Sequence, residues 1–243
     1  MKQRVNPLSD NRFQAVDFYR GLAFISMFIY HFCFFFNYYH FTKFHFFSKF
    51  GWIFQISIAG SFFILVGISL YLAHSKGIRY KKIFFRLSKI IFCACIITIV
   101  SFFINPGFLV TFGILHSITV CTILGLVFLR PGNINLLFGI CFILLGKWFK
   151  HDFFNSDYLQ WIGFFTFKKA TFDIQPLFPW IGVVVIGIWL APFLIKSRLT
   201  QWQASNPTSR FVTLIGRHTL FLYMAHVPFI FCILEILRLL SQK

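Results

Sequence analysis

The stretch VDFYRGLAFISMFIYHF, residues 16–32, decides the fold class of this chain. Most of its residues are apolar, and the apolar run continues past Phe32, so it reaches the roughly 20 residues that cross a bilayer as a helix. It also carries an aspartate, an arginine and a histidine, which are costly inside a membrane and mark functional sites there. The stretch therefore predicts a membrane-spanning helix with a polar face.

The composition extends this prediction to the rest of the chain. Of 243 residues, 58% are hydrophobic and 12% are charged, against about a quarter charged in soluble domains, and the mean hydropathy is +0.77. We expect an all-α polytopic membrane helix bundle, a single domain over residues 1–243 with a cytoplasmic lead at 1–15. About seven spans are predicted, at residues 16–36, 52–73, 83–104, 110–129, 133–149, 178–196 and 212–239.

The formal net charge of +17 reflects topology rather than nucleic-acid binding, because the lysines and arginines mostly flank the apolar runs. Their bias places the N-terminus inside and the C-terminus outside, with long outer loops at 37–51 and 150–176. The six cysteines form no CxxC pair, so no metal site is expected. The chain is predicted to be a multi-pass membrane protein with its N-terminus in the cytoplasm.

The first helix carries its polar residues on one stripe. Arg20 and His31 are eleven residues apart, which leaves about 20° between them and about 16 Å of helix rise. Asp17 is one turn before Arg20, where it can form an ion pair. The stripe therefore links a cytoplasmic cation to an imidazole in the outer half of the membrane. The alternative is an ion pair that marks the helix end and a histidine that snorkels outward.

The other polar residues of the spans extend this picture to two layers. His116 follows the short outer turn NPG, although a membrane histidine often serves only as a hydrogen-bonding group between helices. Arg217 and His226 differ by about 180° on an ideal helix, so one of them is expected to be structural, and Pro228 favours a kink. The cytoplasmic layer contains Arg20, Arg86, Arg217 and His218. The outer layer contains His31, His40, His45 and His116, with Asp173 nearby.

Five stretches, in order, resemble a known family: DFYRGLAFISMFIYHF (17–32), LVGISL (65–70), FGILHSI (112–118), PLFPWIGVVVIGI (176–188) and GRHTLFLYMAHVPF (216–229). They are similar to bacterial relatives of the heparan-α-glucosaminide N-acetyltransferase catalytic domain. The resemblance implies a membrane-embedded acyltransferase. Its donor would be acetyl-CoA, bound from the cytoplasmic side, and its acceptor an amine or hydroxyl near the outer face.

The resemblance also bears on individual residues. The related acyltransferase-three group has an arginine, ten residues and then a histidine in its first helix, and that histidine is regarded as catalytic. Arg20 and His31 match this spacing. In the lysosomal enzyme the active-site histidine lies in the first lumenal loop, and His45 is its nearest match by position. That enzyme has an asparagine where this chain has His31, and the aspartate that many bacterial relatives carry shortly after this position is replaced by apolar residues.

We therefore expect an acetyltransferase that acts on an envelope saccharide in the lipid bilayer, with a homo-oligomer as one possible assembly. His31 would be the general base or carry the acetyl group transiently, assisted by His116 and His45. The CoA phosphates would be held by the cytoplasmic layer, with Asp17 orienting Arg20. A transporter or flippase for an anionic or sugar-linked solute is the alternative, although we find no internal symmetry. A structural subunit of an envelope complex is a third possibility.

Overall fold

The computed structural model describes residues 13–42, 49–130, 132–167, 171–197 and 202–241, and every regular element in these ranges is helical. The α-helices are α1 (Gln14–Tyr38), α2 (Lys49–His74), α3 (Tyr80–Ile104), α4 (Ile114–Gly125), α5 (Asn133–Trp148), α6 (Leu177–Lys196), α7 (Pro207–Arg217) and α8 (Thr219–Ser241). Short 3-10 turns are η1 (Pro106–Phe108), η2 (Leu126–Phe128), η3 (Asp152–Asn155) and η4 (Gln160–Ile162). The all-α prediction is confirmed.

Five of these helices are long and apolar enough to cross a membrane, namely α1, α2, α3, α6 and the part of α8 from Thr219 to Leu240. The spans predicted at 110–129 and 133–149 correspond to α4 and α5, which are apolar but shorter. The span predicted at 212–239 is divided between α7 and α8. The chain is thus a multi-pass membrane protein, and the count of seven spans stays a prediction.

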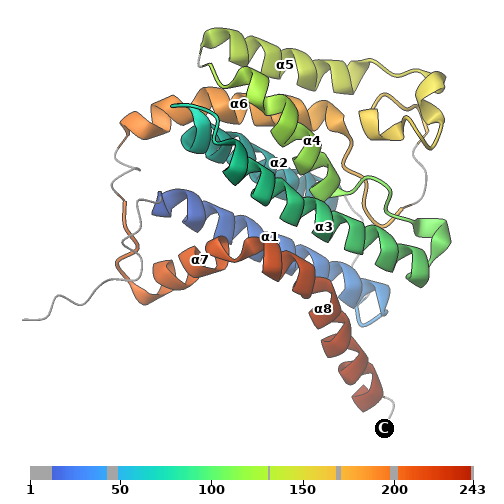
Figure 1. Cartoon of the computed structure of the whole chain (residues 1–243). Helices are drawn as coiled ribbons and strands as arrows, with labels where there is room; N and C mark the ends of the chain where they lie inside the picture. The colour runs from blue at the N-terminus through green and yellow to red at the C-terminus, as the bar shows by residue number, and fades with distance from the viewer. Residues whose placement is uncertain (1–12, 43–48, 131, 168–170, 198–201, 242–243) are drawn as a thin grey trace, which may run out of the picture.

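The helices form two groups that meet at α1 and α2 (Figure 1). In the first group α6 packs between α2 and α5, and α4 packs against α2, α3 and α6. In the second group α7 and α8 pack along α1, and the far part of α8 turns away from the rest of the bundle (Figure 1). The bundle therefore has an inner scaffold and a flank made of α1, α7 and α8.

The scaffold is held by apolar packing between α2 and α6. Phe63 is fully buried and its ring stacks on Trp180, with centroids 4.9 Å apart and an interplanar angle of 11°. Val184, Ile188 and Leu70 are also fully buried in the same cluster. Lipid does not reward helix association by the hydrophobic effect, so close packing of this kind is what holds such helices together.

The start of α7 is fixed by local sequence signals. Asn206 is the N-cap, and its Oδ1 accepts a hydrogen bond from the Ser209 backbone N–H at 2.7 Å. Pro207 follows in the first turn, where its missing N–H costs nothing. Gln14, in the first turn of α1, accepts a hydrogen bond from the Ala204 backbone N–H at 3.0 Å through its Oε1. These contacts attach the beginning of α7 to the beginning of α1.

Candidate functional site

A buried carboxylate in the first turn of α1 gathers two guanidinium groups. Asp17 is 4% exposed, and its Oδ1 accepts a hydrogen bond from Arg20 Nη1 at 2.7 Å, as their spacing of three residues on one helix allows. Arg20 Nη2 donates to Ser69 Oγ on α2 at 2.8 Å. Arg217, from α7, brings its Nε to 3.7 Å from Asp17 Oδ2. Asp17 therefore connects α1 to α7 directly and, through Arg20, to α2.

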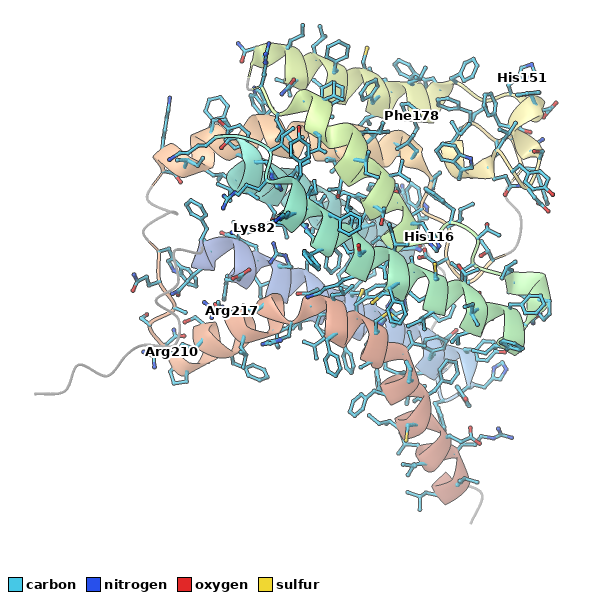
Figure 2. The ribbon with its side chains drawn as sticks, in the orientation of Figure 1. Lys82, His116, His151, Phe178, Arg210 and Arg217 are labelled. Atoms are coloured by element: carbon cyan, nitrogen blue, oxygen red, sulfur yellow. The ribbon has the colours of Figure 1, made fainter. Side chains whose placement is uncertain are left out.

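The contact between Arg217 and Asp17 depends on two glycines at the crossing of α1 and α7. A Cβ atom on Gly216 would lie 1.7 Å from the Asp17 carbonyl oxygen, and one on Gly21 would lie 2.1 Å from the Val212 carbonyl oxygen. Only glycine allows two helix backbones to approach so closely. Figure 2 labels Arg217 at the end of α7 and Arg210 nearer its start. The crossing places Arg217, at the end of α7, beside Asp17.

Arg86 adds a third positive charge at this end of the bundle. It is partly buried on α3 and lies within electrostatic range of Arg20 and of His74. We call Asp17, Arg20, Arg86 and Arg217 the basic cluster. Its three guanidinium groups exceed its one carboxylate, and within the described part of the chain Arg217 Nη2 is buried without a hydrogen-bond partner. Excess positive charge and an unused donor suit an anionic ligand.

His218 was also predicted for this layer. It is exposed and follows the last residue of α7, and its backbone N–H donates to the carbonyl oxygens of Leu214 and Ile215. His218 is therefore a surface residue at the junction of α7 and α8, next in sequence to Arg217.

Two histidines from different helices meet farther along α1. The rings of His31 on α1 and His226 on α8 are in edge-to-face contact, with centroids 4.9 Å apart and an interplanar angle of 71°. His226 is 5% exposed and also faces the ring of Phe24. We call His31 and His226 the histidine pair. On α1, His31 lies about 16 Å of helix rise from Arg20.

Hydrogen bonds fix the tautomer of both rings. His31 Nδ1 lies 3.0 Å from the Met27 carbonyl oxygen, and His226 Nδ1 bonds the Tyr223 carbonyl oxygen. A carbonyl only accepts, so each Nδ1 carries the hydrogen and each neutral ring keeps its lone pair on Nε2. Among the described residues, His226 Nε2 is buried without a partner. Both imidazoles thus present an unprotonated nitrogen.

A break in the last helical segment brings both Arg217 and His226 to α1. The expectation that one of them is structural assumed one straight helix over 212–239. Instead α7 ends at Arg217, His218 adopts φ −106° and ψ 18°, and α8 begins at Thr219. The break removes the 180° offset, so Arg217 contacts Asp17 while His226 contacts His31. His226 was not among the predicted catalytic residues, although it lies in the stretch 216–229 that resembles the family and close to Pro228.

His116 has a different environment. Thr98 Oγ1 donates its hydrogen to the Val110 carbonyl, so at 3.3 Å His116 Nε2 is the donor to Thr98. His116 Nδ1 accepts from the Gly113 backbone N–H, also at 3.3 Å. Both ring nitrogens are therefore engaged by the protein. Figure 2 shows His116 at the beginning of α4, beside α3, and these contacts favour a structural role in joining the two helices.

Asp173 lies near His116, as the sequence suggested. Its Oδ2 accepts a hydrogen bond from the Ile114 backbone N–H at 2.8 Å, so it caps the start of α4 from a distant part of the chain. The same carboxylate lies within electrostatic range of Tyr223 on α8. The segment before α6 therefore faces the helix that carries His226.

The remaining predicted residues are placed as follows. His40 is exposed and lies two residues after the end of α1, and His45 lies outside the described residues. Within the described ranges, no group of three or more His, Cys, Asp or Glu side chains could hold a metal ion.

Comparison with known protein families gives a match over most of the chain. A family model described as "Heparan-alpha-glucosaminide N-acetyltransferase, catalytic" matches residues 12–228. The matched range contains the whole basic cluster and the whole histidine pair. No curated protein and no solved structure matches the chain.

Proposed function

The chain belongs to the family of the heparan-α-glucosaminide N-acetyltransferase catalytic domain, and from this membership we propose that it moves an acetyl group from acetyl-CoA to an amine or hydroxyl of an envelope saccharide. The single observation that carries the proposal is the arrangement along α1. A basic cluster with excess positive charge lies at one end, and unprotonated imidazole nitrogens lie about 16 Å of helix rise away.

The basic cluster is suited to the anionic end of the donor. Guanidinium groups bind phosphates through paired, charge-assisted hydrogen bonds. Arg217 Nη2 is buried with no protein partner, and Arg86 and Arg20 repel each other electrostatically unless an anion lies between them. Asp17 orients Arg20 and Arg217, and the buried Nη2 of Arg217 remains as a donor for a phosphate oxygen.

His31 is suited to the transfer step. With Nδ1–H held by the Met27 carbonyl, its Nε2 can accept the proton of an acceptor amine or hydroxyl. The acceptor atom then attacks the thioester carbonyl carbon, and the carbon–sulfur bond breaks. Binding the phosphates at the basic cluster and the thioester beside His31 supplies the positioning on which acyl transfer depends.

The direction of transfer is part of the proposal. With the N-terminus in the cytoplasm, the basic cluster faces the side that supplies acetyl-CoA, and the histidine pair lies in the outer half of a bacterial cytoplasmic membrane. The acceptor then approaches from outside. His116 and Asp173 support the helix ends near this side.

The test is acetyl-CoA binding and turnover by the purified protein in nanodiscs, with labelled acetyl traced onto added amino sugars. Arg217→Gln is expected to raise the KM for acetyl-CoA by about 10-fold or more, because a hydrogen bond to a charged group contributes about 1.5–3 kcal/mol. Arg210→Gln is the matched control on the same helix, because Arg210 Nε donates to the Ala204 carbonyl and not to Asp17. It should leave KM unchanged.

His31→Gln is expected to lower kcat by about 100-fold or more, because a positioned general base contributes about 10²–10⁴. Equal kinetics for Arg210→Gln and Arg217→Gln would contradict the donor site. A folded protein that neither binds nor hydrolyses acetyl-CoA would exclude the acetyltransferase and favour the transporter.

A further inference from the structure

We infer that His226 is a second catalytic histidine, and that it and His31 act as one base whose single proton is shared between their Nε2 atoms. The inference rests on the proposed acetyl transfer and deepens it. It starts from the contact between the two rings, with centroids 4.9 Å apart, and from the unpartnered Nε2 of a side chain that is only 5% exposed.

Packing alone does not explain why residue 226 is a histidine. Its neighbours include the rings of Phe24 and Tyr223, against which an apolar side chain would pack without losing a hydrogen bond to water. A histidine inside a membrane commonly forms a hydrogen bond between helices. His226 instead bonds the Tyr223 carbonyl of its own helix. A buried polar atom left without a partner requires an explanation.

The position of His226 is set by two features of α8. Its Nδ1–H bond to Tyr223 orients the ring, and the break between α7 and α8 turns that face of the helix toward α1. Pro228 lies inside α8, where proline bends a helix, and Figure 1 shows α8 turning away from α1. The two histidines therefore meet near the point at which α8 begins to turn away from α1.

The shared base accepts the proton that the acceptor loses and returns it to the leaving group. The acceptor loses its proton to the Nε2 atom of His31, and the pair holds that proton between two nitrogens. The acceptor's nitrogen or oxygen forms a bond to the acetyl carbon as the carbon–sulfur bond breaks. The proton then passes to the departing CoA sulfur, which leaves as the thiol. Both imidazoles return to the neutral state in which they began.

Asparagine separates this role from a structural one. An asparagine amide at position 226 can still donate to the Tyr223 carbonyl, as Nδ1–H does, but it provides no base in place of Nε2. His226→Asn is therefore expected to lower kcat by about 100-fold while the KM for acetyl-CoA stays within about twofold. The matched control is His151→Asn, at an exposed loop histidine that accepts from the Phe153 backbone N–H.

A double-mutant cycle tests whether the two histidines act as one unit. If they share one proton, the variant that carries both His31→Asn and His226→Asn is expected to be no slower than His31→Asn alone. A loss equal to the product of the two single losses would show independent roles and overturn the inference. Turnover by His226→Asn at the wild-type rate would overturn it as well, while leaving the acetyltransferase intact.

The wild-type protein provides a measurement that no folding defect can disturb. The acidic limb of its pH profile for log kcat should have a slope of one, because a single proton occupies the whole base. A slope of two, with chemistry limiting the rate, would show two independent bases and contradict the shared base. A wild-type protein without acetyl-CoA turnover defeats the proposed function, and this inference with it.

Discussion

The interface between α2 and α6 and the interface of α1 with α7 and α8 use buried residues in opposite ways. The first contains Phe63 stacked on Trp180 and fully buried aliphatic side chains. The second contains Asp17 and His226, which are 4% and 5% exposed. In the described part of the chain, the buried side-chain nitrogen and oxygen atoms that lack a hydrogen-bond partner are Asp17 Oδ2, Arg217 Nε, Arg217 Nη2 and His226 Nε2.

All four of these atoms therefore lie on α1, α7 and α8. Buried polar groups without partners cost free energy, about 1–3 kcal/mol each, and the scaffold of α2 and α6 has to offset that cost. Local rules of packing and polar satisfaction are violated in native proteins mainly at functional sites. The comparison thus assigns stability to one interface and chemistry to the other, and substitutions can test this division.

The largest effect on stability is expected from Phe63→Ala, in the scaffold. Removing a fully buried phenylalanine ring leaves a cavity beside Trp180 and costs about 3–5 kcal/mol. Thermal unfolding in detergent would measure the loss. The turnover of acetyl-CoA per folded molecule should change little, because Phe63 stacks on Trp180 in the scaffold and belongs to neither the basic cluster nor the histidine pair.

Phe103→Ala is the matched control, because Phe103 on α3 is 80% exposed. It should leave the unfolding midpoint nearly unchanged. If Phe63→Ala abolished turnover while the protein remained folded, the scaffold and the site could not be separated in this way.

Hydropathy was sufficient to predict most of the scaffold. The predicted spans 52–73 and 178–196 agree with α2 and α6 to within a few residues, because a long apolar run has few alternatives in a bilayer. The span at 212–239 was wrong at its start. Hydropathy does not detect the helix break at His218, because it is averaged over a window that includes the apolar residues on both sides of the break.

The site was predicted in part for the same reason. The ion pair of Asp17 with Arg20 follows from their spacing on one helix. The contacts of Arg217 with Asp17 and of His226 with His31 join segments some 200 residues apart, and they require both the helix break and the glycine crossing. Neither feature can be recognised from the spacing of residues along the sequence. The prediction therefore placed Arg217 and His226 on opposite sides of one ideal helix, whereas both side chains reach α1.

An intermediate effect is expected from Gly216→Ala, at the crossing of α1 and α7. The new Cβ would lie 1.7 Å from the Asp17 carbonyl oxygen, so the helices must move apart. Overpacking of this kind costs about 1–3 kcal/mol. The displacement also withdraws Arg217 from Asp17, so the KM for acetyl-CoA should rise together with the loss of thermal stability.

Gly60→Ala is the control for this substitution in the scaffold. A Cβ at Gly60 on α2 would have Trp180 as its neighbour, at an ordinary 3.9 Å. Alanine should therefore be neutral or stabilise α2 by up to about 1 kcal/mol. A destabilisation as large as that of Gly216→Ala would mean that the close crossing of α1 and α7 is not special.

The smallest effect is expected from Lys150, a charge on the scaffold side. Its Nζ donates to the Gly163 carbonyl oxygen at 2.7 Å and lies 5.3 Å from the centroid of the Phe165 ring. Desolvation there lowers the pKa of Lys150 below its usual value of 10.5. Between the lowered pKa and 10.5 the unfolded chain binds more protons than the folded one, so the stability contributed at this site rises with pH through that window.

The unfolding midpoint of the wild type, relative to Lys150→Met, should therefore rise by about 1 °C as the pH approaches 10.5. Lys147→Met, at an exposed position in the last turn of α5, controls for the loss of one positive charge. The effect is small because Lys150 lies beside water at the end of the scaffold, unlike the buried charges on α1 and α7. A difference that falls with pH would show that the folded loop favours the ammonium form, and the contrast between the two sides of the bundle would then weaken.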